Sequence, residues 1–243
     1  MNKKTLVYEF TGLPGSGKTT VTKEVIHCLG REGIRTPSYE YLREQRSFKF
    51  THAGQLIKYL LFFLFCLKKW KVSLQLARYM LKIKPLSRDR VKFTVAFLRT
   101  YYFIDSLLKK KADHDVIVLE EGLVQNIWGM FISGHPPDST ELKPILQRVC
   151  QVLPISVVHV NVDVQTAIQR IQQRTYGAGR FDKIEITEAE RLLNVHEKHL
   201  QEIIGLILSL DCHLFTIDGK AEIGEKVMTI VKDIKKQIRQ HAG

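Results

Sequence analysis

Apolar residues form two kinds of pattern along this chain. Short continuous runs rich in Val, Ile and Leu occupy 5–10, 116–122, 155–162 and 213–219, and PSYEYL at 37–42 is a fifth candidate strand. Between these runs, apolar positions recur at helical spacing and predict helices at 18–31, 90–111, a segment ending near 132, 141–152, 164–174, 187–209 and 222–240. Strands that alternate with helices predict an α/β fold in one domain over 1–243, with a five-stranded parallel sheet, helices on both faces, and ligands at the carboxyl ends of the strands.

A segment at 45–92 interrupts this alternation. Within it, YLLFFLFCL at 59–67 is apolar with no polar face and has lysines on both sides. As a helix, nine residues rise only about 13–14 Å, against roughly 30 Å of bilayer hydrocarbon, so the run cannot span a membrane. The sequence leaves two alternatives open for this basic, apolar helical insertion. It is buried against a helix expected at 72–83, or residues 53–84 contact an anionic membrane surface peripherally.

The positive charge of the chain is concentrated in the same segment. The net charge is +12, and residues 45–92 contain 12 Lys or Arg but one acid, Asp89. These basic residues alternate with an aliphatic run rather than with stacking aromatics, so nucleic acid is not the expected partner. The four cysteines form no C-x-x-C pair, and we expect a reducing, cytoplasmic compartment. Peripheral contact with the inner face of the membrane and a homodimer are both left open.

The stretch GLPGSGKTT at 12–20 fits the pattern of a phosphate-binding loop. It follows the first strand and precedes the first helix, as G-x-x-x-x-G-K-[ST] requires. Glycines let the backbone turn its N–H groups toward a phosphate, and the helix N-terminus adds its dipole. We expect Lys18 to bridge the β- and γ-phosphates of ATP and the Thr19 hydroxyl to bind Mg²⁺. The nucleotide-binding residues predicted from the loop are Gly12, Pro14, Gly15, Ser16, Gly17, Lys18, Thr19 and Thr20.

Arginines after the fourth expected strand predict a lid over the phosphates. Arg170 and Arg174 are at i and i+4 on one helix, and Arg180 follows on a loop with glycines at 177 and 179. Phosphoryl transfer needs such positive charge and exclusion of water, so 170–186 is the predicted lid. We expect Arg170 to contact the nucleotide, and Arg174 and Arg180 to act on the charge that develops during transfer. A solvated basic helix is the alternative interpretation of the same residues.

Over most of its length the sequence resembles the thymidylate kinases and related nucleoside and nucleotide kinases. The resemblance rests on GLPGSGKT, on YLREQ at 41–45, on VIVLEEG at 116–122, on QRIQQR and GRFD at 169–182, and on FTIDG before the last helix. It implies a P-loop kinase fold and transfer of the ATP γ-phosphoryl group to a small acceptor. By this resemblance Glu120 is expected in the Mg²⁺ shell, Glu44 on the acceptor side as general base, and Arg99 on the acceptor phosphate. Glu40 is a further carboxylate that competes for the role of base.

The chain departs from this family at two positions. Glu121 replaces an arginine beside the phosphates, and Gln45 replaces a proline after Arg43-Glu44. A lost catalytic charge would cost several powers of ten in rate. These departures keep a second hypothesis open, an ATP-binding regulatory or membrane-docking module without kinase turnover. They also leave the identity of the acceptor undetermined.

Overall fold

Four parallel strands form the centre of the protein. The computed structural model describes residues 5–46, 52–82, 87–109, 114–131, 136, 138–173, 181, 184–210 and 212–242. The strands are β1 (Leu6–Thr11), β2 (Val116–Leu119), β3 (Ile155–Asn161) and β4 (His213–Asp218), in the spatial order β2-β1-β3-β4. β1 therefore lies inside the sheet, with Val7 opposite Ile117 on one side and Ile155 on the other. Burial on both faces explains the apolar runs of β1, β2 and β3, whereas the edge strand β4 is only partly buried.

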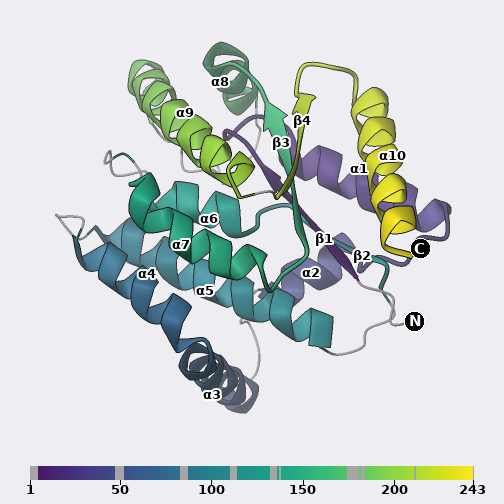
Figure 1. The fold of residues 1–243 in the computed structure, drawn as a ribbon. Coiled ribbons are helices and arrows are strands. Elements are labelled where there is room, and N and C mark those ends of the chain that lie inside the picture. Colours follow the sequence, from purple (N-terminus) through teal and green to yellow (C-terminus); the bar gives the residue numbers. More distant parts are fainter. Residues whose placement is uncertain are drawn as a thin grey trace.

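Helices cover both faces of this sheet (Figure 1). α1 and α10 pack together on one side, and α5, α6, α7 and α9 lie on the other. α3 lies farthest from the sheet, next to α4. The described helices are α1 (Lys18–Arg31), α2 (Tyr39–Arg46), α3 (His52–Lys68), α4 (Trp70–Lys82), α5 (Arg88–Lys109), α6 (Leu123–Met130), α7 (Ser139–Cys150), α8 (Val164–Gln172), α9 (Ile186–Leu208) and α10 (Ile223–Ala242).

The strand predicted at 37–42 is wrong, because this segment begins α2. The described sheet accordingly has four strands where the sequence predicted five. The chain reaches the free edge of β2 only at Arg35, whose carbonyl oxygen accepts from Asp115 N at 2.8 Å. Pro37 has no N–H to donate to a ladder, and the Ser38 hydroxyl then accepts from Tyr41 N at 3.1 Å, as an N-cap does. These two local features start a helix where the sequence analysis predicted a strand.

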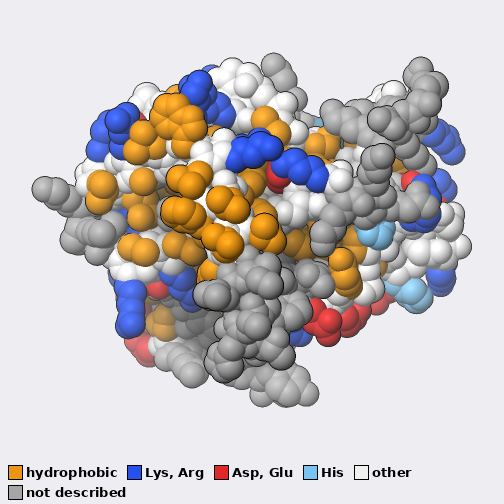
Figure 2. All heavy atoms as spheres, turned by 90° about the horizontal axis from the view of Figure 1, so that it is seen from below, with side chains coloured by type: hydrophobic (Ala, Val, Ile, Leu, Met, Phe, Trp, Pro, Cys, Tyr) orange, Lys and Arg blue, Asp and Glu red, His pale blue; other side chains and the backbone are white. Residues whose placement is uncertain are grey.

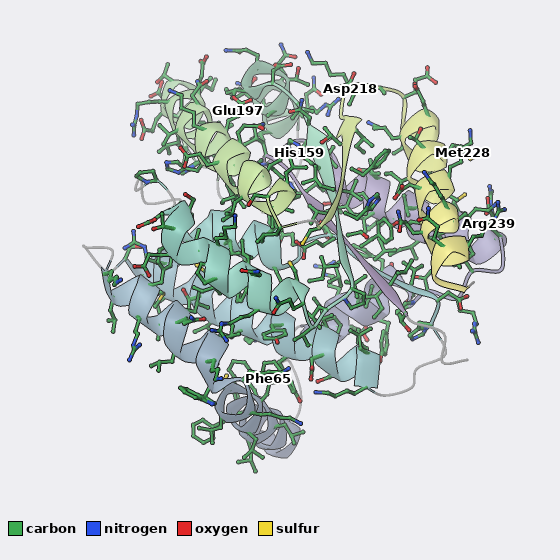
Figure 3. All side chains as sticks on the ribbon, viewed as in Figure 1. Phe65, His159, Glu197, Asp218, Met228 and Arg239 are labelled. Carbon is green, nitrogen blue, oxygen red and sulfur yellow. The ribbon has the colours of Figure 1, made fainter. Side chains whose placement is uncertain are left out.

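The insertion contains α3 and α4, and over residues 59–82 one side of each helix is buried. Phe65 packs its ring against Tyr101 and Tyr102 of α5, with ring centroids 5.1 and 5.3 Å apart (Figure 3). On α4, Val72, Leu76 and Tyr79 are buried. The core alternative therefore holds for one face of the insertion. It does not account for the rest of the apolar run, most of which is exposed.

A buried carboxylate joins the sheet to α6. Glu9, in the middle of β1, is fully buried, and its two oxygens accept from Leu123 N at 2.6 Å and Val124 N at 2.9 Å. These are N–H groups of the first turn of α6, which have no partner inside the helix and carry its positive dipole end. Glu9 therefore acts as an N-terminal cap supplied by a distant strand.

This cap requires a glycine at position 122. A Cβ on Gly122 would lie 1.9 Å from Glu9 Oε2 and 2.5 Å from Glu9 Cβ. We expect Gly122→Ala to lower the free energy of unfolding by about 1–3 kcal/mol, because Glu9 must move and release α6. Chemical denaturation followed by circular dichroism measures this loss. Gly205→Ala, at an exposed site in α9 with open space around it, is the matched control and should stabilise by about 0.5–1 kcal/mol. Equal effects of the two substitutions would show that the cap does not need Gly122.

Candidate active site

The phosphate-binding loop predicted from the sequence lies between β1 and α1, where it turns on three glycines with positive φ. These angles are 153° at Gly12, 85° at Gly15 and 91° at Gly17. The loop also packs closely, because a Cβ at Gly12 would lie 2.5 Å from Val160 O and one at Gly15 would lie 2.4 Å from Ala167 O. Larger residues would therefore fail on both conformation and space. The loop is pressed against β3 and α8 at the carboxyl end of the sheet.

Lys18 is buried and holds the loop closed on itself. Its Nζ donates to Gly12 O at 2.7 Å and to Leu13 O at 2.9 Å. The entrance to the loop is fixed from α6, since Gln125 Oε1 accepts from Thr11 Oγ1 at 3.0 Å and from Gly12 N at 3.3 Å. The cationic group is thus held at the centre of the loop, within reach of an anion that enters it.

Glu120 lies immediately after β2 and is bound on both carboxylate oxygens. Thr19 Oγ1 donates to one oxygen and the Tyr39 hydroxyl of α2 donates to the other. Burial, followed by the hydrogen bond to Glu120, raises the pKa of Tyr39 well above its usual value, so the phenol keeps its proton. The two residues that the sequence assigned to Mg²⁺, Thr19 and Glu120, are therefore adjacent in the fold.

A cavity of about 560 Å³ extends from the phosphate-binding loop toward α5 and α6. Its inner part has the aromatic side chains of Phe93, Trp128 and Phe181 and the amides of Gln125 and Asn126. Flat apolar walls with a few amide groups suit a planar ring that carries hydrogen-bonding edges. The remaining lining residues come from the loop, from the end of β2 and from α8: Pro14, Gly15, Gly17, Lys18, Thr19, Thr20, Glu120, Glu121 and Arg170.

Phe93 is positioned by a close approach between α5 and α6. A Cβ at Gly129 would lie 2.3 Å from Cδ1 of the Phe93 ring. Trp128, next to it on α6, donates from Nε1 to His196 O of α9 at 2.8 Å. The aromatic walls of the cavity are therefore held by packing between three helices.

A smaller cavity of about 330 Å³ lies on the other side of Glu120, under α2. Tyr39 and Arg43, one helical turn apart, line it together with Glu120 and Glu121. Glu120 and Glu121 line both cavities. The pair of carboxylates therefore separates the loop and its aromatic pocket from the surface of α2.

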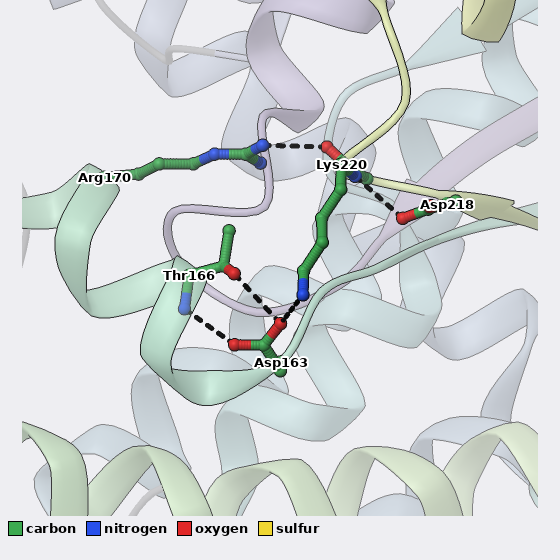
Figure 4. A network of polar contacts seen from close by, with 6 residues as sticks. Asp163, Thr166, Arg170, Asp218 and Lys220 are labelled. Atoms are coloured by element: carbon green, nitrogen blue, oxygen red, sulfur yellow. Dashed lines mark hydrogen bonds and ion pairs between the residues drawn. The ribbon is translucent and has the colours of Figure 1, made fainter.

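Arg170 joins α8 to the loop and to the turn after β4 (Figure 4). Its Nη1 donates to Ser16 O at 3.4 Å and its Nη2 to Gly219 O at 3.0 Å. The helix that carries it is capped by Asp163, which accepts from Thr166 N at 2.8 Å and pairs with Lys220. The ion pair with Lys220, and then the bonds from Thr166, lower the pKa of Asp163. This network places a guanidinium group at the rim of the loop.

The other predicted site residues are less closely connected to the loop. Glu44, expected at the end of a strand, is exposed on α2, and Glu40 is exposed on the same helix. Arg99 is partly buried on α5 and lines neither cavity. Arg174 and Arg180, with most of the predicted lid, lie outside the described residues. Among the described residues, no group of three or more His, Cys, Asp or Glu side chains is arranged to hold a metal ion.

Several residues of the site were missed by the sequence analysis. Tyr39 falls in the segment that the sequence predicts as a strand, and Phe93, Trp128 and Phe181 look like ordinary core residues in the sequence. Gln125 follows the apolar run of β2 by six residues, and only its polarity at a buried helical position marks it out. Glu9 had the strongest signal, a single acid inside an apolar strand.

His159 lies on β3 in the interior, beneath the loop (Figure 3). Burial, and then the positive charge of Lys18, lower its pKa to about 4. The imidazole is therefore neutral at physiological pH and adds no second positive charge beside the lysine.

The fold is similar to that of a known kinase. A solved structure of deoxyadenosine kinase from M. mycoides with the products dCMP and dCDP matches with a TM-score of 0.50 and 15% identity, over 95% of this chain and 100% of that one. A second, with dATP bound, matches with a TM-score of 0.46 and 15% identity, over 95% of this chain and 99% of that one. No protein-family model matches the chain, and no curated protein matches its sequence. The first similarity shows that the chain has the α/β fold of this nucleoside kinase.

The neutral state of His159 predicts a specific loss of stability in acid. An unfolded histidine has a pKa of about 6.5 and the folded one about 4, so between these values the unfolded chain binds more protons. The stabilisation is complete above the unfolded pKa and is lost as pH falls toward the folded pKa. From about pH 7.5 to about pH 5, wild type should lose about 2 kcal/mol more free energy of unfolding than His159→Gln. Denaturant titrations at a series of pH values test this, and parallel curves would refute it.

Proposed function

We propose that this protein is a Mg²⁺–ATP-dependent kinase that transfers the γ-phosphoryl group of ATP to a nucleoside or nucleotide. The observation that carries the proposal is the single cavity that joins Lys18, Thr19 and Glu120 to an aromatic pocket. One end has the cation and loop that phosphates require, and the other has flat walls and amides suited to a nucleobase. The similar M. mycoides enzyme, whose structure contains deoxynucleotides, supports this choice of acceptor class.

The loop residues bind and orient the donor. Backbone N–H groups around Gly15 and Gly17 receive the β-phosphate, and the Lys18 ammonium moves from the carbonyl oxygens of Gly12 and Leu13 to the terminal phosphates. Arg170, at the rim, offers its guanidinium plane to the adenine ring. ATP held there would have its terminal phosphate in the same cavity as Phe93, Trp128 and Phe181.

Thr19 and Glu120 fit a Mg²⁺ site of the kind that binds nucleotides. Mg²⁺ in such sites uses one or two protein oxygens, with phosphates and waters completing its shell. The ion would supply charge neutralisation between the terminal phosphates. The Thr19 hydroxyl and the Glu120 carboxylate, already in contact, are the oxygens that would hold it.

The transfer needs one further carboxylate to take the proton of the acceptor hydroxyl. The acceptor oxygen forms a bond to the γ-phosphorus while the bond from that phosphorus to the β-phosphate oxygen breaks, which leaves ADP. Glu121 lines both cavities, whereas Glu44 lines neither. We therefore propose that Glu121 accepts the proton of the acceptor hydroxyl as the general base. Glu121 occupies the position where the thymidylate kinases that the sequence resembles have an arginine. Arg43, which lines the smaller cavity, compensates part of the negative charge.

Loss of Lys18 should remove turnover and leave the fold intact. Lys18→Met keeps most of the side-chain volume but removes the charge that faces the phosphates, so we expect kcat to fall by about 10²–10³-fold. Turnover is measured with labelled ATP and a panel of nucleosides and nucleotides, and the fold by circular dichroism. Lys232→Met, at an exposed site on α10, is the control. Nucleotide binding without turnover in wild type would instead favour the regulatory module.

Substitution of Glu120, Glu121 and Glu44 one at a time should distinguish the role of each carboxylate. We expect Glu120→Gln to raise the Mg²⁺ concentration needed for half-maximal rate, because it removes a charge beside Thr19. Glu121→Gln should lower kcat and flatten the acidic limb of the pH–rate profile, as loss of a general base does. Glu44→Gln is the matched control and should resemble wild type. If Glu44→Gln alone loses kcat and its pH dependence, Glu44 rather than Glu121 is the general base.

A further inference from the structure

The outer face of α3 is apolar and exposed. Going round the helix, Phe65 faces α5, while Leu60, Phe63, Leu64 and Leu67 lie on the opposite side and are exposed by half or more. A helix that is apolar all round is normally enclosed by protein or lipid on every side. In the described structure, protein packs against α3 only on the side of Phe65. The opposite side is therefore suited to contact with another apolar surface.

α4 continues the same surface. Trp70, Leu74 and Leu81 are exposed and follow one stripe at i, i+4 and i+11, opposite the buried residues of that helix. Nine of the 17 large hydrophobic side chains that the described structure exposes come from residues 59–81. Figure 2 shows hydrophobic side chains gathered into a broad patch on the face that carries these helices, with Lys and Arg beside it. We call the outward side of α3 and α4 the apolar face.

Basic residues border the apolar face, and the sequence of the two helices contains no acid. Lys68 and Lys71 are exposed where α3 meets α4, and Arg78 is exposed farther along α4. Lys69 is instead turned inward, with its Nζ 4.0 Å from Asp105 Oδ1. The positive charge that remains at the rim therefore faces outward together with the apolar side chains.

We propose that the apolar face docks on the surface of an anionic lipid bilayer. The leucines and aromatic rings would lie at the boundary between headgroups and acyl chains, and the lysine and arginine side chains would reach the lipid phosphates. α3 and α4 would lie along the surface, since no helix in the described part of the chain is both long and apolar enough to cross a membrane. This proposal does not rest on the kinase activity.

Charge favours lipid over a second copy of the chain as the occupant. Two copies joined through this face would bring together two rims that carry Lys68, Lys71 and Arg78, with no acid on either helix. Like charges brought together at an interface oppose association. A surface of lipid phosphates instead pairs with every one of these groups and also accepts the apolar side chains.

Deletion of the insertion does not test this proposal cleanly. Residues 53–84 include Phe65, Val72, Leu76 and Tyr79, which are buried in the core, so a deletion would expose the core of α5 and α7. Substitutions confined to exposed side chains avoid this difficulty. The apolar variant is Phe63→Gln with Leu64→Gln and Leu67→Gln, and the charge variant is Lys68→Ala with Lys71→Ala.

Each variant has a matched control elsewhere on the surface. Leu208→Gln, Ile223→Gln and Met228→Gln remove three exposed apolar side chains from α9 and α10, where the exposed fractions are 56%, 41% and 48%. Lys232→Ala with Lys236→Ala removes two exposed charges from α10. Circular dichroism and thermal unfolding are measured first, to check that all four variants are folded before binding is tested.

Sedimentation with vesicles provides the test. The wild-type chain should sediment with phosphatidylglycerol–phosphatidylcholine vesicles and remain in solution with phosphatidylcholine alone. It should be released as salt rises, since interactions between exposed charges are screened beyond about 10 Å at 0.1 M. The apolar variant should weaken binding by about a hundredfold and the charge variant by about tenfold, with both controls like wild type. The proposal is overturned if wild type does not bind, or if the controls lose as much. It is also overturned if wild type binds polyglutamate in preference to vesicles, as for an acidic protein partner, or if it is a dimer that the apolar variant converts to monomer.

Discussion

The buried carboxylate of Glu9 is the interaction on which the arrangement of the site depends. It lies on an inner strand, in the interior of the sheet, and binds the first N–H groups of α6. Because α6 carries Gln125, Asn126 and Trp128, its position relative to β1 sets both the entrance of the phosphate-binding loop and one wall of the larger cavity. If a solvent-exposed loop made this contact instead, the entrance of the phosphate-binding loop and the cavity wall could move independently. A buried carboxyl group that loses these two hydrogen bonds would incur a desolvation cost, which ties the position of α6 to that of β1.

Local sequence signals were sufficient for most of the fold. Apolar runs mark β1, β2 and β3 because a strand covered by helices on both faces has no polar side. A shorter apolar stretch also marks β4, although this edge strand is only partly buried. The exception is 37–42, which the sequence analysis predicted as a strand. Pro37 and Ser38 determined the outcome, one by withholding a backbone donor and the other by capping α2. Both signals are visible in the sequence, but they act through backbone hydrogen bonds that a hydrophobic pattern does not record.

Some residues of the candidate site can likewise be identified from a local sequence pattern, and others come from distant parts of the chain. The loop could be predicted because its glycines, lysine and threonine occur within nine residues and their function follows from that spacing. The contact of Gln125 with the loop could not be predicted, since it comes from a distant helix, whereas Arg170 was expected near the nucleotide from the sequence. Thr19 and Glu120 are in contact because both follow parallel strands, and their role as Mg²⁺ ligands stays a prediction. Parallel strands end at the same edge of the sheet, and this constraint holds without knowledge of any side-chain contact.

The contact between Gly129 and the Phe93 ring has a consequence for how this scaffold could diversify. With hydrogen alone at position 129, the ring of α5 rests directly on the backbone of α6. Any larger residue there would push Phe93 toward the cavity that it lines, and the space for a ring-shaped acceptor would shrink without change in the loop, in Lys18 or in the carboxylates. In the proposed kinase, this contact would be one position behind the cavity wall that affects the size of the acceptor. Selection, or a designed library at residues 93 and 129, could change the width of the cavity without change in the phosphate-binding loop.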